Sequence, residues 1–265
     1  EARDAAEGKR FWADRKKLGA IAKRTNAFKL NEDVVLPLDA LAEFARFCDR
    51  VNVEEERAAQ RAFAWRVREY VEAAQEEDGG FLPEKIARAR LRCDAGLQAI
   101  DGAAERELRS LAPVEALRKD LLDLVRGYAR VASGIDALFA EERRRRIVIA
   151  THMHAGDGNV HVNIPVLSND RGMMRRAEET VDRVMAEVAR LGGVCSGEHG
   201  IGVTKLKYLE PAIVAELSAY RRQVDPRGTM NPGKLEDLSL VDRIFTPSFN
   251  LLELEARILR HGKLE

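Results

Sequence analysis

The chain of 265 residues is 45% hydrophobic and 33% charged, with 44 Lys and Arg residues against 44 Asp and Glu residues. This composition is typical of a globular protein with ample apolar material for a buried core. Because the formal net charge is zero, the chain has no overall basic field, which argues against nucleic acid or an anionic membrane surface as a partner. The arginine run at residues 143–146 is the one candidate for a local basic patch.

Neither a membrane span nor a secretory signal is visible. No segment approaches about 18 uninterrupted apolar residues, and the N-terminus lacks an apolar run, so we expect no transmembrane segment and a cytoplasmic location. Cys48, Cys93 and Cys195 form no CxxC pair, which argues against a disulfide framework, a Cys-ligated zinc site and an iron–sulfur cluster. Since the chain begins with Glu1 inside a helical pattern, we expect a fragment of a longer protein. Peripheral attachment to a membrane through that longer protein is left open.

The first 53 residues predict a helix, a strand and a second helix. The strand is the β-rich stretch at residues 27–36, and Pro37 closes it before a helix that begins near Leu38. Residues 54–146 are instead dominated by Ala, Glu, Arg and Leu, which predicts long helices with breaks at residues 78–80 and near Gly102. The apolar positions hold no regular heptad, so we favour an antiparallel helical insertion over an intermolecular coiled coil.

Strand patterns return at residues 147–153 and 160–164, followed by helices expected near residues 175–191 and 206–224. We expect the strand from before the insertion to pair with these two in one antiparallel sheet with helices on one face. The fold class is therefore α+β. The expected domains are an α+β body, residues 1–53 with 147–265, and a helical insertion, residues 54–146. Cys195 falls in a pattern that we interpret as an apolar strand, where a structural role is expected.

Four of the five histidines lie in two short segments, THMHAGDGNVHVN and SGEHGIG. In the first, a Gly-rich turn separates the strands that carry His154 and His161. Because paired strands lie only about 5 Å apart, a hairpin of this kind brings the two imidazoles together. In the second, Glu198 adjoins His199, and both side chains can serve one site only where the backbone bends, which the glycines allow.

Two histidines and one carboxylate can hold a divalent metal with coordination positions left for a substrate. We therefore predict His154, His161 and Glu198 as metal ligands. His199 is left as a general base, because its ordinary pKa is close to neutral. His152 would share the strand face of His154, and it remains either a further ligand or a partner outside the ligand set.

Three motifs in this order, HAGDGNVHVNI, GGVCSGEHGIG and DPRGTMNPGKL, resemble the C-terminal half of FAD-linked 2-hydroxy-acid dehydrogenases of the vanillyl-alcohol oxidase superfamily. That family includes D-lactate dehydrogenases, the glycolate oxidase flavin subunit and D-2-hydroxyglutarate dehydrogenase. The resemblance covers residues 147–236 well and residues 9–50 more loosely. It implies a ferredoxin-like antiparallel sheet with helices, which faces a separate FAD-binding domain of the same protein.

The resemblance also implies residue roles. It matches the same three metal ligands, with zinc as the expected metal, and the same base. Arg15 and Lys29 match the pair that binds the substrate carboxylate, and Asn159 and Asn231 lie in stretches that approach the flavin. The implied reaction is oxidation of a small 2-hydroxy acid to a 2-oxo acid, with FAD as cofactor, and the chain alone is expected to be inactive.

Two other classes of function stay open. The same residues can activate water in a stand-alone metal-dependent hydrolase. Alternatively, the chain is a non-catalytic interaction module that docks a partner through its helical insertion. The motifs leave open which 2-hydroxy acid is oxidised, which electron acceptor is used, and the oligomeric state.

Overall fold

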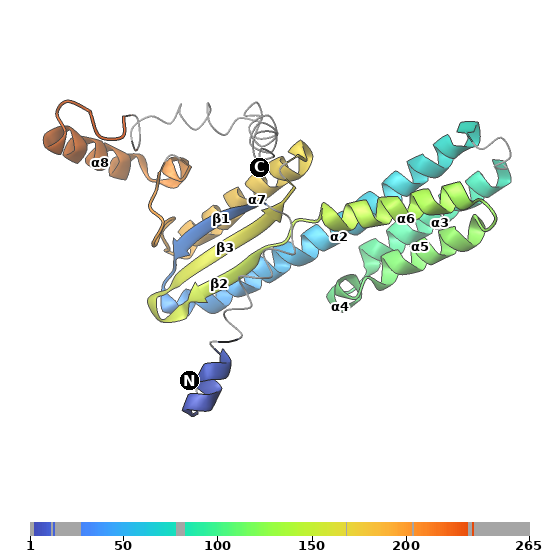
Figure 1. Ribbon diagram of the computed structural model, residues 1–265, viewed down its shortest axis with the longest axis horizontal. Helices are drawn as coiled ribbons and strands as arrows, with labels where there is room; N and C mark the ends of the chain where they lie inside the picture. The colour runs from blue at the N-terminus through green and yellow to red at the C-terminus, as the bar shows by residue number, and fades with distance from the viewer. Residues whose placement is uncertain are drawn as a thin grey trace, which may run out of the picture. The chain divides into compact units, whose positions relative to one another are not determined.

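The protein is described by a computed structural model covering residues 3–11, 13, 28–77, 83–167, 169–202, 204–232 and 235. The chain divides into two compact units. We call Glu1–Phe47 with Ile149–Glu265 the sheet unit, and Cys48–Val148 the helical unit. Figure 1 shows the strands in the first and a set of long helices in the second.

Three antiparallel strands in the order β1-β3-β2 form the sheet: β1 (Phe28–Val35), β2 (Ala150–His154) and β3 (Asn159–Val166). β1 and β2 both pair with the central strand β3. The predicted pairing of a strand from before the helical segment with the two strands after it is confirmed. The α+β class, with an antiparallel sheet and a long helical segment, is confirmed as well.

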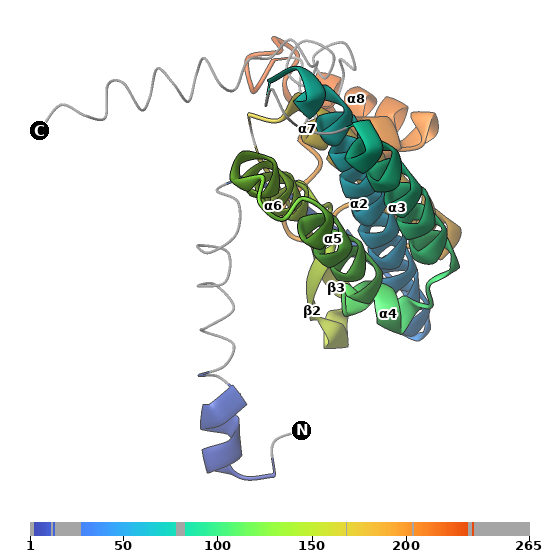
Figure 2. The same ribbon diagram turned by 90° about the vertical axis from the view of Figure 1, so that its right-hand side faces the viewer.

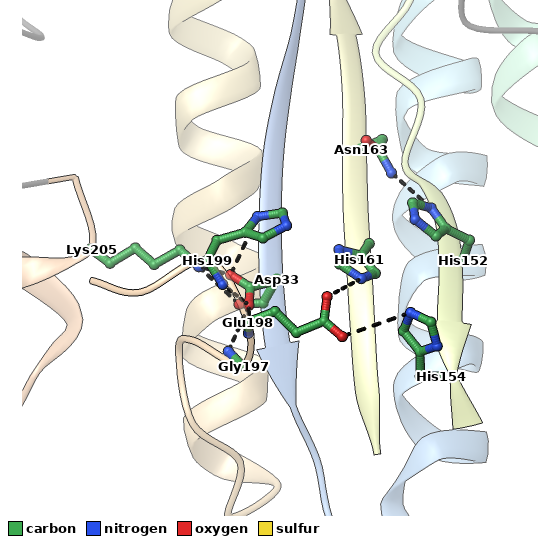
Figure 3. Close-up of polar contacts among 9 residues, drawn as sticks. All are labelled: Asp33, His152, His154, His161, Asn163, Gly197, Glu198, His199 and Lys205. Atoms are coloured by element: carbon green, nitrogen blue, oxygen red, sulfur yellow. Dashed lines mark hydrogen bonds and ion pairs between the residues drawn. The ribbon is translucent and has the colours of Figure 1, made fainter. Parts of the chain in front are cut away.

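The two faces of the sheet differ because β3 alternates between polar and apolar residues over residues 159–164. Its sequence is NVHVNIPV, and its four even-numbered residues, Val160, Val162, Ile164 and Val166, are at most 1% exposed. These side chains point to one face of the sheet. That face packs against α7 (Arg171–Arg190), whose own apolar stripe is buried. In Figure 3 α7 lies behind the strands, and the histidines stand in front. The helix that follows β1 is α2 (Leu41–Glu77), which begins in the sheet unit.

Two expectations for the later part of the sheet unit are wrong. Cys195 lies in a bend, not in a strand, and only its neighbour Val194 forms an isolated bridge, with Val35. The single helix expected at residues 206–224 is a short 3-10 turn, η3 (Leu206–Tyr208), followed by α8 (Pro211–Val224). Because proline has no backbone N–H and clashes with the preceding turn, it starts α8 and cannot continue a helix from Leu206.

The helical unit contains the later part of α2 together with α3 (Pro83–Gly102), α4 (Glu105–Arg109), α5 (Ala112–Leu124) and α6 (Ala129–Arg144). Figure 2 shows α2, α3, α5 and α6 running alongside one another. Their facing stripes form one apolar cluster that includes Val67, Cys93 and Leu121. The described part of residues 54–146 holds no strand, as predicted, and α3 ends at Gly102. The break expected at residues 78–80 lies outside the described residues.

The arginine run is largely occupied by ion pairs inside the helical unit. Arg143 and Arg146 both bind Glu56, at 2.5 and 2.8 Å, and Arg145 lies 3.4 Å from Glu141. Burial alone would raise the pKa of Glu56, but hydrogen bonds from Gln60 and the two arginines lower it overall. Three of the four arginines thus pair with acidic side chains of the helical unit, whereas Arg144 is exposed.

Among the helices that the structure describes, none combines the length and the apolar character that crossing a bilayer requires.

Candidate metal centre

A tight hairpin turn sets the register of the histidines. β2 and β3 are joined by the short helical turn η2 (Ala155–Asp157) and Gly158, which has a φ of 70°. A Cβ atom at Gly158 would lie 2.1 Å from the carbonyl oxygen of Leu36, so only glycine fits. The resulting register places His152 opposite His161.

The three imidazoles of the hairpin lie together on the polar face of the sheet. The ring of His152 stacks on that of His161, with centroids 4.5 Å apart, and the ring of His154 meets His161 edge-on at 5.8 Å. Asn163 contacts the Nδ1 atom of His152 through its amide nitrogen at 3.2 Å. Figure 3 shows His152 directed toward Asn163, while His154 and His161 are directed toward Glu198.

Glu198 lies on the bent loop that follows α7 in the chain. Residues 197–199 form a bend, which a shared site for Glu198 and His199 requires. Glu198 Oε1 lies 3.8 Å from His154 Nε2, and its Oε2 lies 3.6 Å from His161 Nε2. One ligand atom from each of these three residues falls within 4.8 Å of the others.

This geometry fits a divalent metal. Bonds of about 2.0–2.2 Å in a tetrahedral arrangement put neighbouring ligand atoms roughly 3.4 Å apart, close to the two histidine–carboxylate distances. The donor set of two imidazole nitrogens and one carboxylate suits zinc and related transition metals. Among the described residues, this is the one group of three or more His, Cys, Asp or Glu side chains with such spacing.

His199 stands beside this group and outside it. Its ring centroid is 5.2 Å from that of His161, and its side chain is 42% exposed. Its Nδ1 atom lies 3.7 Å from Oδ1 of Asp33, so Nε2 is the ring nitrogen left to face a substrate. An imidazole placed in this way can accept a proton from a group bound at the metal.

Asp33 is a residue that the sequence interpretation missed. It is completely buried on β1, opposite His161. Its Oδ2 atom accepts hydrogen bonds from the backbone N–H groups of three consecutive residues, Gly197, Glu198 and His199. Lys205 donates to its Oδ1 and to its carbonyl oxygen. Little in the sequence distinguishes it, because β1 (FKLNEDVV) also carries Lys29, Asn31 and Glu32.

Burial and hydrogen bonding act on Asp33 in opposite directions. Burial by itself would raise the pKa of this carboxyl group, but the bond from Lys205 and the backbone N–H groups outweigh it, so the pKa is well below its ordinary value. Asp33 is therefore a buried anion at the pH values where proteins normally work.

The remaining predicted residues lie at different distances from this group. Lys29 is on the same face of β1 as Asp33, but four residues or about 13 Å along the strand, and it is exposed. Asn159 is 4% exposed, and its side chain lies directly beneath Gly197. Asn231 is exposed, with a positive φ of 44°. Arg15 lies outside the described residues.

The chain is similar in sequence to several known oxidases and dehydrogenases. The chain is 29% identical over 178 residues to glycolate oxidase subunit GlcD of Bacillus subtilis, which covers 60% of this chain and 38% of that protein. It is 40% identical over 90 residues to D-2-hydroxyglutarate dehydrogenase of Stutzerimonas stutzeri, covering 31% and 19%. A probable mitochondrial D-lactate dehydrogenase of Danio rerio is 34% identical over 90 residues, covering 32% and 18%.

The chain thus spans less than two fifths of the length of these relatives. The family model described as FAD linked oxidases, C-terminal domain, matches residues 1–57 and 51–235. That match takes in both histidine motifs and the strand that carries Asp33. The chain therefore belongs to the family of C-terminal domains of FAD-linked oxidases.

Proposed function

We propose that this chain is the metal-bearing, substrate-binding C-terminal part of a flavin-dependent dehydrogenase that oxidises a small 2-hydroxy acid to a 2-oxo acid. The observation that carries the proposal is the convergence of His154, His161 and Glu198 within 4.8 Å, with His199 beside them. The printed names of the relatives, which concern glycolate, D-lactate and D-2-hydroxyglutarate, support the substrate class. The helical segment is proposed as an insertion into the α+β body.

The proposed mechanism divides the work between the metal ligands and the base. A divalent metal, with zinc favoured, supplies a positive charge that lowers the pKa of a bound hydroxyl group. His154, His161 and Glu198 hold it at the polar face of the sheet. His199 accepts the hydroxyl proton at Nε2, since its Nδ1 atom faces the buried carboxylate of Asp33. The exposed side chain of His199 leaves that nitrogen accessible to a substrate.

The substrate carboxylate requires positive charge. Lys29 lies on the polar face of β1 and is exposed, so its flexible side chain can extend along the sheet toward the metal centre. We propose Lys29 and Arg15 as the carboxylate-binding pair. An arginine suits this role because its guanidinium group offers two parallel donors to the two oxygens.

FAD, when bound, supplies the acceptor for the two electrons removed from the substrate. We propose that it is held mainly by an FAD-binding domain of the same protein, with Asn159 and Asn231 contributing from this chain. The proposed contact of Asn159 with FAD is supported by its buried Oδ1 atom, which has no hydrogen-bond partner among the described residues. The chain itself contributes orientation, proton transfer and electrostatics.

The decisive experiment measures zinc binding by the chain. We expect one equivalent of Zn²⁺ to bind in a calorimetric titration of the purified chain. His161→Ala removes a buried ligand and should weaken zinc binding by about 100-fold or more. Losing a residue that only hydrogen-bonds to a ligand already costs about 10- to 100-fold in metal affinity. His261→Ala removes the one histidine outside the two motifs and serves as the matched control. Equal zinc affinity in His161→Ala and the wild type would refute the proposed centre.

A further inference from the structure

The loop that presents Glu198 and His199 is folded around a single carboxylate oxygen. Oδ2 of Asp33 accepts from Gly197 N at 2.7 Å and His199 N at 3.0 Å, and from Glu198 N between them. Successive backbone N–H groups that point at one anion form a nest, a conformation that the anion itself stabilises. In Figure 3 Asp33 lies at the base of this loop, between Lys205 and His161.

Lys205 supplies the charge that a buried anion needs. Its side chain is 5% exposed, and it donates to both the carboxylate and the carbonyl oxygen of Asp33, the latter at 2.9 Å. An unpaired buried carboxylate would carry a large desolvation cost, which a hydrogen-bonded ammonium group offsets. Lys205 thereby fixes the direction of the carboxylate, with Oδ1 toward the ammonium group and Oδ2 toward the loop.

We propose that Asp33, held by Lys205, is the positioning residue of the metal centre. Its carboxylate fixes the backbone of residues 197–199 and so places Glu198 over His154 and His161. The same carboxylate lies 3.7 Å from His199 Nδ1 and orients that ring. The inference rests on the proposed function, because it takes Glu198 as a metal ligand and His199 as the base.

The test uses Asp33→Asn, which keeps the size of the side chain. The amide retains one oxygen and replaces the other with an NH₂ group, so it cannot accept from both the loop and Lys205. We expect the affinity of the chain for Zn²⁺ to fall about 10- to 100-fold. We also expect the visible absorption spectrum of the Co²⁺-loaded chain to shift, because a displaced Glu198 changes the coordination geometry. A residue that only stabilises the fold would leave this spectrum unchanged.

The matched control is Asp182→Asn. Asp182 is an ion-paired aspartate of the same unit, bound to Lys207 and Tyr208, and its side chain is 52% exposed. It should leave both the zinc affinity and the Co²⁺ spectrum as in the wild type. Hydrogen exchange followed by mass spectrometry should show faster exchange over residues 197–199 in Asp33→Asn only.

The outcomes separate the two proposals. If the wild-type chain binds no Zn²⁺ or Co²⁺, the proposed centre fails, and this inference fails with it. If the wild type binds and Asp33→Asn binds equally well with an unchanged Co²⁺ spectrum, only the positioning role is overturned. Should Asp33→Asn fail to fold, Lys205→Gln is measured in the same way, and wild-type affinity and spectrum in that variant overturn the inference.

Discussion

Glu56 in the helical unit and Asp33 in the sheet unit are both buried carboxylates, and they are stabilised in different ways. Glu56 in the helical unit is 6% exposed, and side chains of α2 and of residues 143–146 bind it. Asp33 in the sheet unit is fully buried and binds one lysine and three backbone N–H groups. In both, these bonds outweigh the effect of burial and lower the pKa of the carboxyl group.

The difference lies in what each carboxylate holds. The groups around Glu56 are side chains, whose hydrogen-bonding capacity is used within the network, so the network ties helices together. The N–H groups around Asp33 belong to the backbone, so the side chains of Glu198 and His199 remain available for other contacts. Buried charge therefore stabilises packing in the helical unit, whereas in the sheet unit it shapes a loop that faces the histidines.

The largest effect is expected from His199→Ala in a protein that contains both this chain and the proposed FAD-binding domain. Loss of the base should lower kcat about 10²- to 10⁴-fold, while the zinc affinity stays close to that of the wild type, because His199 is not a proposed ligand. Steady-state kinetics and metal analysis of the same sample check this. Near-normal turnover would mean that another residue accepts the substrate's hydroxyl proton, with His152 the nearest candidate.

A smaller effect is expected from Glu56→Gln, which leaves Arg143 and Arg146 without their anion. We expect a loss of about 2 to 3 kcal/mol in the free energy of unfolding, below the roughly 3–5 kcal/mol of fully buried pairs, because both arginines keep some contact with water. Urea unfolding followed by circular dichroism measures this loss. The zinc affinity should not change, since Glu56 belongs to the network of the helical unit.

The control for Glu56→Gln is Glu115→Gln. Glu115 pairs with Arg118 at 2.9 Å, and its side chain is 44% exposed. Exposed pairs of this kind contribute about 1 kcal/mol or less. Equal destabilisation by the two variants would mean that the buried network around Glu56 contributes no more than an ordinary surface pair.

The smallest effect concerns acid pH. Because the pKa of Glu56 is lower in the folded chain than in the unfolded chain, its contribution to stability is fully present above the unfolded value of about 4.3. That contribution is lost as the pH falls through the lowered folded value. Urea unfolding at a series of pH values below about 5 should show a smaller loss of stability in Glu56→Gln than in the wild type. Parallel pH profiles for the two proteins would contradict the assignment.

Local sequence patterns determined much of the sheet unit. The strand patterns at residues 147–153 and 160–164, with the Gly-rich turn between them, predicted the hairpin of β2 and β3. A shared site for Glu198 and His199 required a bend in the backbone, which the glycines around Glu198 allow. Such features depend on residues close together in the chain, so periodicity and backbone freedom are enough to predict them.

Only the tertiary structure showed what the buried charges bind. Asp33 is 164 residues before Gly197, and Glu56 is 87 residues before Arg143, so no local pattern links either pair. The arginine run looked like a surface patch because sequence gives charge without giving burial. Whether a charged side chain faces water or a distant partner is decided by strand register and helix packing, because the cost of burying an ion is met only where the fold brings its counter-charge within reach.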